Sequence, residues 1–319
     1  MSQNMNITGI HHITAIAGDA QKNLDFYTGV LGLRFIKKTV NFDDPGVYHL
    51  YYGDDIGNPG SIMTFFPYGG IRRGRHGKGL VNTTTFSVPM DALAYWEKRL
   101  DRFGIPRKDA QERLGKEVFI YFEDHDGLGL ELIFNDLDER KPFSDGPVPP
   151  EYAIRGFYSA EIWAAGYERT GALLTEKMDH RLIGESGNRF RFATHDAPGN
   201  YIDILVPSAN TTGLSGYGTI HHIAFRTPDA NSQLEVRQGI RQYGLQPTPV
   251  IDRQYFKSIY FREPGGVLFE VATDAPGFMV DENADKLGTE LKLPPHHEFN
   301  REHIESILPA ISEHSKSYV

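Results

Sequence analysis

The sequence predicts an α+β fold built from four copies of one βαβββ unit. The segment GIHHITAIAGD at 9–19 returns almost unchanged as TIHHIAFRTPD at 219–229. The order of one alternating strand, one amphipathic stretch and three short strands recurs every roughly sixty residues, which indicates a repeat architecture. Because each unit buries one sheet face only against another unit, the four units should pair into two cup-shaped half-barrel sheets.

The first unit shows the pattern most clearly. Residues 9–17 alternate as a strand does, and Asp19 precedes an amphipathic helix over 20–32 that Gly32 ends as a C-cap. Three short strands follow, separated by Asp-Pro-Gly and Asn-Pro-Gly turns: LRFIKKTVNF, VYHLYYGD and SIMTFFPY.

The other three units repeat this order. In each, a first strand precedes a helix, and the helix precedes three short strands. The first strands are VNTTTFSVP, GFYSAEIWAA and TIHHIAFRTPD. The expected helices span 90–104, 166–178 and 231–244.

The expected division of the chain follows from these units. Residues 1–140 hold the first two, and 154–278 hold the third and fourth. Between them, 141–153 is rich in Pro and polar residues and reads as a linker. The charged, Pro-broken tail at 279–319 should lie on the surface.

Composition limits the function. The chain has 319 residues, a net charge of −9, no basic block and no cysteine. This argues against a nucleic-acid partner, and thiolate ligands are excluded. Without an apolar run long enough for a membrane span or a recognisable leader, a cytoplasmic protein is expected. Any metal must be held by imidazole and carboxylate.

Two His-His pairs and one glutamate predict a metal site. His11-His12 and His221-His222 occupy matching strands, and a strand turns successive side chains to opposite faces. One imidazole of each pair can therefore face a shared interior, and Glu270 lies in the last strand of the fourth unit.

The arrangement of units around this site also follows from the residues. The last strand of the first unit offers no carboxylate or imidazole. The first strands of the second and third units carry no histidine. We therefore expect units 1 and 4 to form the metal site, with Glu131 and Asp203 structural in the other cup.

The chain resembles the vicinal oxygen chelate superfamily, which includes glyoxalases, bleomycin-resistance proteins and extradiol dioxygenases. The segments HHITAIAGDAQKNLDFYTGVLGLRFIKKTVNFDD, YHLYYGDDIGNPGSIMTFFP, IHHIAF and YFREPGGVLFE resemble hydroquinone ring-cleaving dioxygenases in particular. The resemblance implies two glyoxalase-like halves and the metal ligands His12, His222 and Glu270. Two histidines and one carboxylate with open positions suit Fe(II) oxygen chemistry, and Mn(II) fits the same ligands.

The resemblance also implies the residues around the metal. Alternation keeps Thr14 on the face of His12 and turns His11 and His221 away, although they could reach the edge of the site as acid–base groups. Tyr260 and Arg253 would line the pocket, where they could hold a phenolate or a charged oxygen.

The expected reaction is insertion of both atoms of O2 into a hydroquinone-type ring, so the partners are a small aromatic substrate and O2. The alternatives are an extradiol catechol dioxygenase, a glyoxalase-like isomerase or lyase, a thiol-transferring resistance enzyme and a metal-free binding protein. A homo-oligomer is compatible with the edge strands. Four other histidines are not expected in the site: His49, His125, His296 and His297.

Overall fold

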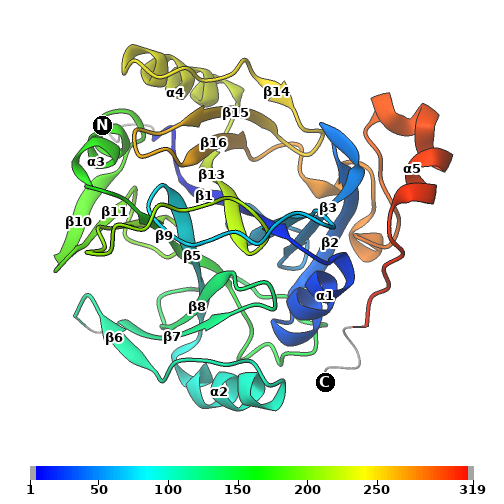
Figure 1. Cartoon of the computed structure of the whole chain (residues 1–319), viewed down its shortest axis with the longest axis horizontal. Coiled ribbons are helices and arrows are strands. Elements are labelled where there is room, and N and C mark those ends of the chain that lie inside the picture. The colour runs from blue at the N-terminus through cyan, green and yellow to red at the C-terminus, as the bar shows by residue number, and fades with distance from the viewer. Residues whose placement is uncertain (1–4, 116, 315–319) are drawn as a thin grey trace.

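The computed structural model describes residues 5–115 and 117–314, which form two eight-stranded sheets with helices on their outer sides (Figure 1). This confirms the predicted α+β fold with two curled half-barrel sheets. None of the helices described is long and apolar enough to cross a membrane.

The first sheet joins units 1 and 4, in the strand order β14-β15-β16-β13-β1-β4-β3-β2. The predicted pairing of the first unit with the fourth is therefore observed. Unit 1 contributes β1 (Gly9–Ala17), α1 (Ala20–Leu24), η1 (Asp25–Val30), β2 (Arg34–Asn41), β3 (Asp44–Gly53) and β4 (Ile62–Pro67). Unit 4 contributes β13 (Thr219–Thr227), α4 (Ala230–Gln242), β14 (Ile251–Asp252), β15 (Lys257–Arg262) and β16 (Leu268–Thr273).

The second sheet joins units 2 and 3, in the order β10-β11-β12-β9-β5-β8-β7-β6. Unit 2 contributes β5 (Leu80–Val88), η2 (Met90–Ala92), α2 (Leu93–Arg102), β6 (Gln111–Arg113), β7 (Glu117–Glu123) and β8 (Gly129–Phe134). Unit 3 contributes β9 (Gly156–Trp163), α3 (Glu168–Lys177), β10 (Arg181–Ser186), β11 (Arg189–Ala193) and β12 (Tyr201–Leu205). Each sheet thus takes one unit from each half of the chain. The described residues 135–155, where the linker is expected, contain no helix or strand. The domain boundaries stay a prediction.

Local signals in the sequence explain the ends of the first helical segment. The Asp19 side chain accepts a hydrogen bond from the backbone N–H of Lys22 at 2.9 Å, as an N-cap does. Gly32 ends the segment with a φ of +71°, which favours glycine. Between them the predicted single helix divides into α1 and the π-helical turn η1, in which the Leu31 N–H donates to the Phe26 carbonyl.

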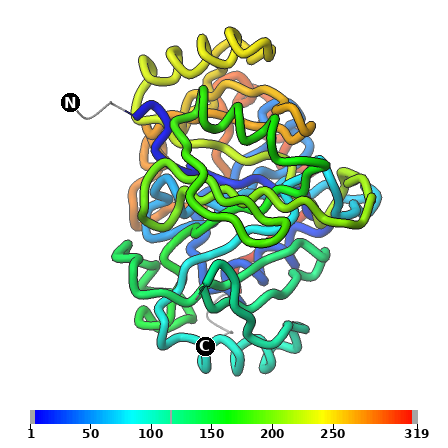
Figure 2. The backbone as a smooth tube through the Cα atoms, turned by 90° about the vertical axis from the view of Figure 1, so that its left-hand side faces the viewer, coloured from blue at the N-terminus to red at the C-terminus, as the bar shows by residue number. Residues whose placement is uncertain are grey.

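The helices lie outside the sheets. Helices α4 and α2 stand at opposite ends of the molecule, with both sheets between them (Figures 1 and 2). Tyr27, Trp96, Leu173 and Ile240 turn fully buried side chains from the helical segments into the core. Burial of such apolar faces, more than helix propensity, stabilises short helices.

The tail packs against β2 and β3. It contains the short helical turns η3 (Phe278–Val280), η4 (Ala284–Lys286) and η5 (Pro295–Asn300) and the helix α5 (Arg301–Ile307). The ammonium of buried Lys37 on β2 donates to carboxylates of Asp281 and Glu282, which attaches the tail to the sheet. His296 is exposed and His297 half-buried, as expected for surface residues of the tail.

Candidate metal centre and its cavity

Three predicted ligands converge at the centre of the first sheet. His12 lies on β1, His222 on β13 and Glu270 on β16, and all three are buried. The Nε2 atoms of the two histidines are 3.3 Å apart, and they lie 3.3 and 2.9 Å from the same carboxylate oxygen, Oε2 of Glu270. Among the described residues, these three form the group whose donor atoms could hold a metal ion.

The spacing of the donor atoms fits one ion. Ligands bound about 2.1 Å from a metal, as nitrogen and oxygen donors are, stand roughly 3 to 3.4 Å from one another. The Nδ1 atoms of His12 and His222 point away from this centre, toward Nδ1 of His11 (2.9 Å) and Nδ1 of His221 (2.8 Å). A hydrogen bond at Nδ1 leaves the Nε2 lone pair for the metal and fixes the ring orientation.

The carboxylate is held in its charged form. Burial by itself would raise the pKa of Glu270, but His12 and His222 outweigh burial and hold that pKa well below its usual range. Burial lowers the pKa of His222, which keeps the imidazole neutral and able to bind a metal. The second carboxylate oxygen, Oε1, accepts a hydrogen bond from the Ser258 hydroxyl.

The predicted orientation of His11 and His221 is wrong in one respect. The β1–β13 pairing passes from Ile10 to His12 and from His222 to Ile220, so His11 and His221 are each the extra residue of a β-bulge. A bulge interrupts strict alternation and re-aims a side chain. Both imidazoles therefore lie against their neighbouring ligands instead of pointing to the opposite face. His221 lines the cavity, whereas His11 is buried behind it with its Nε2 unpartnered.

The pairing registers show a pseudo-twofold relation between units 1 and 4. His12 pairs with Ala224, and His222 pairs with Thr14, across the β1–β13 contact. On the outer sides of these strands, Ala224 pairs with Glu270 and Thr14 pairs with Thr64. Thr64 therefore occupies the position in unit 1 that Glu270 occupies in unit 4.

The Thr64 hydroxyl is hydrogen-bonded to two neighbouring side chains. The Thr14 and Thr64 hydroxyls are 2.7 Å apart, and Thr64 Oγ1 is 2.9 Å from Nε2 of His49. This places Thr14 beside the site, as expected, but inside the wall and not on the cavity surface. Because Thr64 carries no carboxylate, the donor set has three members and not four.

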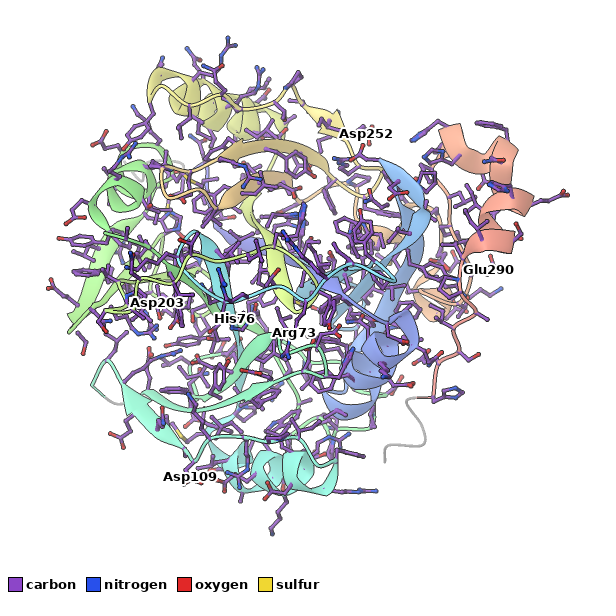
Figure 3. All side chains as sticks on the ribbon, viewed as in Figure 1. Arg73, His76, Asp109, Asp203, Asp252 and Glu290 are labelled. Carbon is purple, nitrogen blue, oxygen red and sulfur yellow. The ribbon has the colours of Figure 1, made fainter. Side chains whose placement is uncertain are left out.

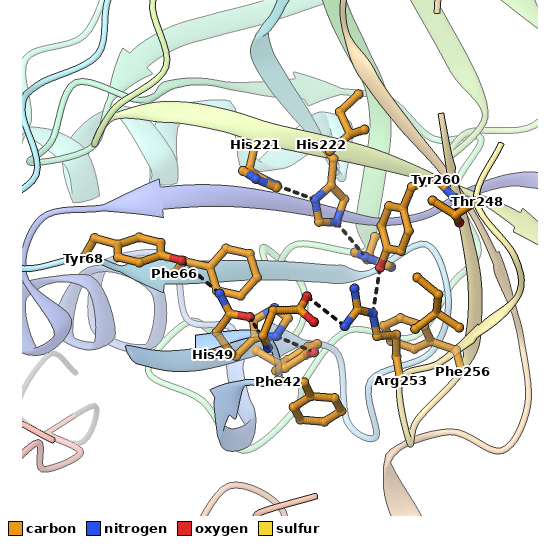
Figure 4. Close-up of a pocket in the computed structure, with 16 residues that line it drawn as sticks. Phe42, His49, Phe66, Tyr68, His221, His222, Thr248, Arg253, Phe256 and Tyr260 are labelled. Atoms are coloured by element: carbon orange, nitrogen blue, oxygen red, sulfur yellow. Dashed lines mark hydrogen bonds and ion pairs between the residues drawn. The ribbon is translucent and has the colours of Figure 1, made fainter. Parts of the chain in front are cut away.

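A cavity of about 370 Å³ opens in front of the triad (Figure 4). The predicted pocket residues Arg253 and Tyr260 line it, and the Arg253 Nε–H donates to the Tyr260 hydroxyl at 3.2 Å. Arg253 also reaches Asp43 at the mouth, with 3.1 Å between Nη1 and Oδ2. The cavity wall is largely aromatic. Besides Tyr260 and the two His-His pairs' members His12, His221 and His222, its rings belong to Phe42, His49, Tyr51, Phe66, Tyr68 and Phe256.

His49 and Tyr51 were not expected in the site. His49 has no counterpart in the His-His repeat, so the repeat does not indicate it. Strand alternation could have indicated both residues together, because His49 and Tyr51 lie two positions apart on β3 and therefore share one face of the strand. Burial keeps the pKa of His49 well below its ordinary value.

The second sheet carries carboxylates at the equivalent positions but pairs them with arginines. Glu131 Oε2 lies 2.6 Å from Nη1 of Arg113. Asp203, labelled in Figure 3, accepts from Arg189 at 2.8 Å and from Arg191 at 2.6 Å. Guanidinium groups thus neutralise both buried carboxylates, which supports their predicted structural role. The positions equivalent to the two histidine ligands hold Thr83 and Ser159.

Comparison with known proteins agrees with this architecture. The family model of the glyoxalase/bleomycin resistance protein/dioxygenase superfamily matches residues 9–132. MhqO of Bacillus subtilis (strain 168), which carries the name of a ring-cleaving dioxygenase, is 46% identical over 94% of this chain and 96% of its own. The chain belongs to this superfamily.

Two further relatives extend the comparison. Chlorohydroquinone/hydroquinone 1,2-dioxygenase of Sphingobium indicum is 33% identical, with 91% of this chain and 92% of the relative covered. A crystal structure described as a Bacillus subtilis dioxygenase superimposes with a TM-score of 0.93 at 44% identity, covering 98% of this chain and 99% of that one. The resemblance to hydroquinone ring-cleaving dioxygenases expected from the sequence is thereby confirmed.

A more distant structure shares the fold alone. Glyoxalase I from Zea mays has a TM-score of 0.64 at 15% identity, covering 83% of this chain and 92% of that one.

Proposed function

We propose that this chain is an Fe(II)-dependent ring-cleaving dioxygenase that inserts both atoms of O2 into a hydroquinone-type ring. The observation that carries the proposal is the three-donor site of His12, His222 and Glu270 at the base of an aromatic-lined cavity. A face with two imidazoles and one carboxylate leaves positions open for both a phenolic oxygen and O2. The names of the relatives support the choice of ring and reaction.

The residues around the donors match the needs of this reaction. Bound iron would supply the redox and Lewis-acid chemistry that brings O2 and the ring together. Aromatic walls at Phe66 and Phe256 hold a planar ring and exclude water. The Arg253 cation and the Tyr260 hydroxyl present hydrogen-bond donors where negative charge on oxygen must be stabilised.

Proton transfer has a candidate in the cavity wall. His221 is exposed to the cavity, and its Nδ1 contacts His222, so its Nε2 stays available to the substrate. Burial and the neighbouring His222 lower the pKa of His221 to about 3, so its imidazole is neutral and its Nε2 is free to accept the proton of a phenolic hydroxyl and pass it on at once. His11, buried behind His12, would instead orient that ligand.

The alternative reactions on this scaffold receive less support. A glyoxalase-like isomerase would use a closed set of four ligands, and Thr64 stands where the fourth would be. A catechol would need its two adjacent hydroxyls at the metal. Mn(II) in place of Fe(II), a cytoplasmic location and a homo-oligomer stay predictions.

The test is oxygen consumption by the reconstituted protein. The chain is loaded anaerobically with Fe(II), mixed with methylhydroquinone and exposed to air, while O2 uptake and the ultraviolet spectrum are followed. We expect one O2 consumed per ring and a new ring-opened chromophore. The His222→Ala variant should lose both, and the Glu131→Gln variant, altered in the other sheet, should keep both.

Three outcomes would change the proposal. Uptake with catechol but with no hydroquinone would retain the iron site and replace the substrate class. Uptake after loading with Mn(II) but not with Fe(II) would replace the metal. No uptake with either ring, despite one equivalent of bound metal, would reject the dioxygenase.

A further inference from the structure

Four side chains, including Thr64, the pseudo-twofold mate of Glu270, are linked by hydrogen bonds. This chain of hydrogen bonds runs from Thr14 to Thr64, then to Nε2 of His49, and from Nδ1 of His49 to the Tyr51 hydroxyl at 2.8 Å. Thr14, Thr64 and Tyr51 are all at most 2% exposed. Neither His49 nor Tyr51 belongs to the group of three metal donors.

The strand registers give Tyr51 a counterpart. Tyr51 pairs with Thr64 on the neighbouring strand, just as Tyr260 pairs with Glu270. The cavity therefore has one tyrosine hydroxyl on each side of the pseudo-twofold relation. The Tyr260 hydroxyl is hydrogen-bonded to Arg253, and the Tyr51 hydroxyl is hydrogen-bonded to His49.

The two tyrosines differ in the rings that they contact. By strand order they are alike, because β4 separates the strand of Tyr51 from β1 just as β16 separates the strand of Tyr260 from β13. The Tyr51 ring packs against His49 at 4.1 Å and Phe278 at 5.1 Å between centroids. The Tyr260 ring, in contrast, lies 5.9 Å from the ring of His222.

In a neutral imidazole one ring nitrogen donates a hydrogen bond and the other accepts one, so the tautomer of His49 sets the direction of its hydrogen bonds to Thr64 and Tyr51. If Nε2 of His49 carries the proton and donates to Thr64, Nδ1 accepts from Tyr51, whose lone pairs then remain for a ring hydroxyl. If instead Nδ1 carries the proton, it donates to the Tyr51 oxygen, and the Tyr51 hydroxyl hydrogen remains to be donated to a ring hydroxyl. In either case one hydrogen-bonding capacity of Tyr51 is left for the cavity. Burial raises the pKa of Tyr51 well above its usual value, so the hydroxyl stays protonated.

We propose that Tyr51 binds the ring hydroxyl that the metal does not hold, and that His49 is a positioning residue acting through Tyr51. This inference rests on the proposed function, because it presumes a substrate with a second hydroxyl across the ring. It makes the His49–Tyr51 pair a determinant of specificity for diphenols over monophenols.

The test measures binding, not turnover. Isothermal titration of the Fe(II)-loaded protein without O2 compares hydroquinone with phenol, which lacks the second hydroxyl. We expect Tyr51→Phe and His49→Phe each to weaken hydroquinone binding roughly three- to tenfold and to leave phenol binding unchanged. The double variant should lose no more than either single variant, because the two residues act as one unit.

Matched variants control for structure. Tyr52→Phe removes the next hydroxyl of β3, which is buried on the opposite face and donates to Asn23, and it should change neither ligand's affinity. His49→Gln keeps a donor and an acceptor and should recover part of the binding if His49→Phe does not fold.

Some results would overturn the inference. Equal weakening for phenol, no weakening for either ligand, or additive losses in the double variant would each do so. These results are separable from failure of the proposed function. A wild-type protein that consumes O2 with hydroquinone but shows them rejects only the role of Tyr51 and His49, whereas one that consumes no O2 rejects the dioxygenase itself.

Discussion

The substitution Glu270→Gln tests the metal site by stability and needs no substrate. Glu270 brings the only negative charge of the triad, and its Oε2 faces both histidine Nε2 atoms. Replacing that oxygen with an amide should abolish tight metal binding, because a neutral amide is a poor ligand for a divalent ion beside two neutral imidazoles.

The expected size of the effect follows from linkage. An ion present at about a thousand times its dissociation constant stabilises the folded state by about 4 kcal/mol. For 319 residues the entropy of unfolding is about 0.7 kcal/mol/K. The wild-type Tm should therefore rise by about 6 °C when Fe(II) is added anaerobically, and the Glu270→Gln Tm should rise by less than about 1 °C.

The matched control is Glu131→Gln, the same change at the equivalent position of the second sheet. Glu131 is buried and paired with Arg113, so its loss should lower the Tm of the metal-free protein. The increase on adding Fe(II) should remain about 6 °C. Differential scanning calorimetry under nitrogen measures both. A Glu270→Gln protein that gains the full metal-dependent increase would refute the assignment of Glu270 as a ligand.

Three further predictions concern the surroundings of the site and the second sheet. Thr64→Glu places a carboxylate at the pseudo-twofold mate of Glu270; bound metal should persist while O2 uptake with hydroquinone falls about tenfold or more, and wild-type uptake would contradict the assignment. Ser258→Ala removes the hydroxyl that donates to Glu270 and should weaken metal binding by about 10- to 100-fold in a chelator competition, with an unchanged constant counting against it. Burial alone would raise the pKa of Asp203, but Arg191 and Arg189 lower it to about 2, so its contribution to stability is present above its unfolded pKa and is lost as pH falls toward 2. Asp203→Asn should cost about 2 kcal/mol at pH 7 in urea unfolding, with the difference shrinking below about pH 4; a difference that does not depend on pH would exclude this cause.

The sequence was informative about the repeat and about the strands that carry the proposed ligands because both are local patterns. A strand alternates with a period of two, so the two His-His strands and the strand of Glu270 could be recognised without coordinates. The absence of histidine from the first strands of units 2 and 3 was enough to predict the pairing of units 1 and 4. Asp19 and Gly32 likewise marked the ends of the first helical segment.

The β-bulges at His11 and His221 could not be predicted from the sequence. Whether one residue is left unpaired depends on how two strands 200 residues apart align, and no periodicity within either strand reports it. For the same reason the side chains of His11 and His221 could not be placed from alternation.

Hence the sequence by itself determined the α+β repeat, the unit pairing and the strands that carry the His-His pairs and Glu270, whereas the choice of His12 and His222 came from the family resemblance. The tertiary structure alone decided that Thr64 stands opposite Glu270, that His49 and Tyr51 line the cavity, and that arginines pair with the buried carboxylates of the second sheet. The physical reason is that strand order and register bring together side chains far apart in sequence, whose contacts no local pattern encodes.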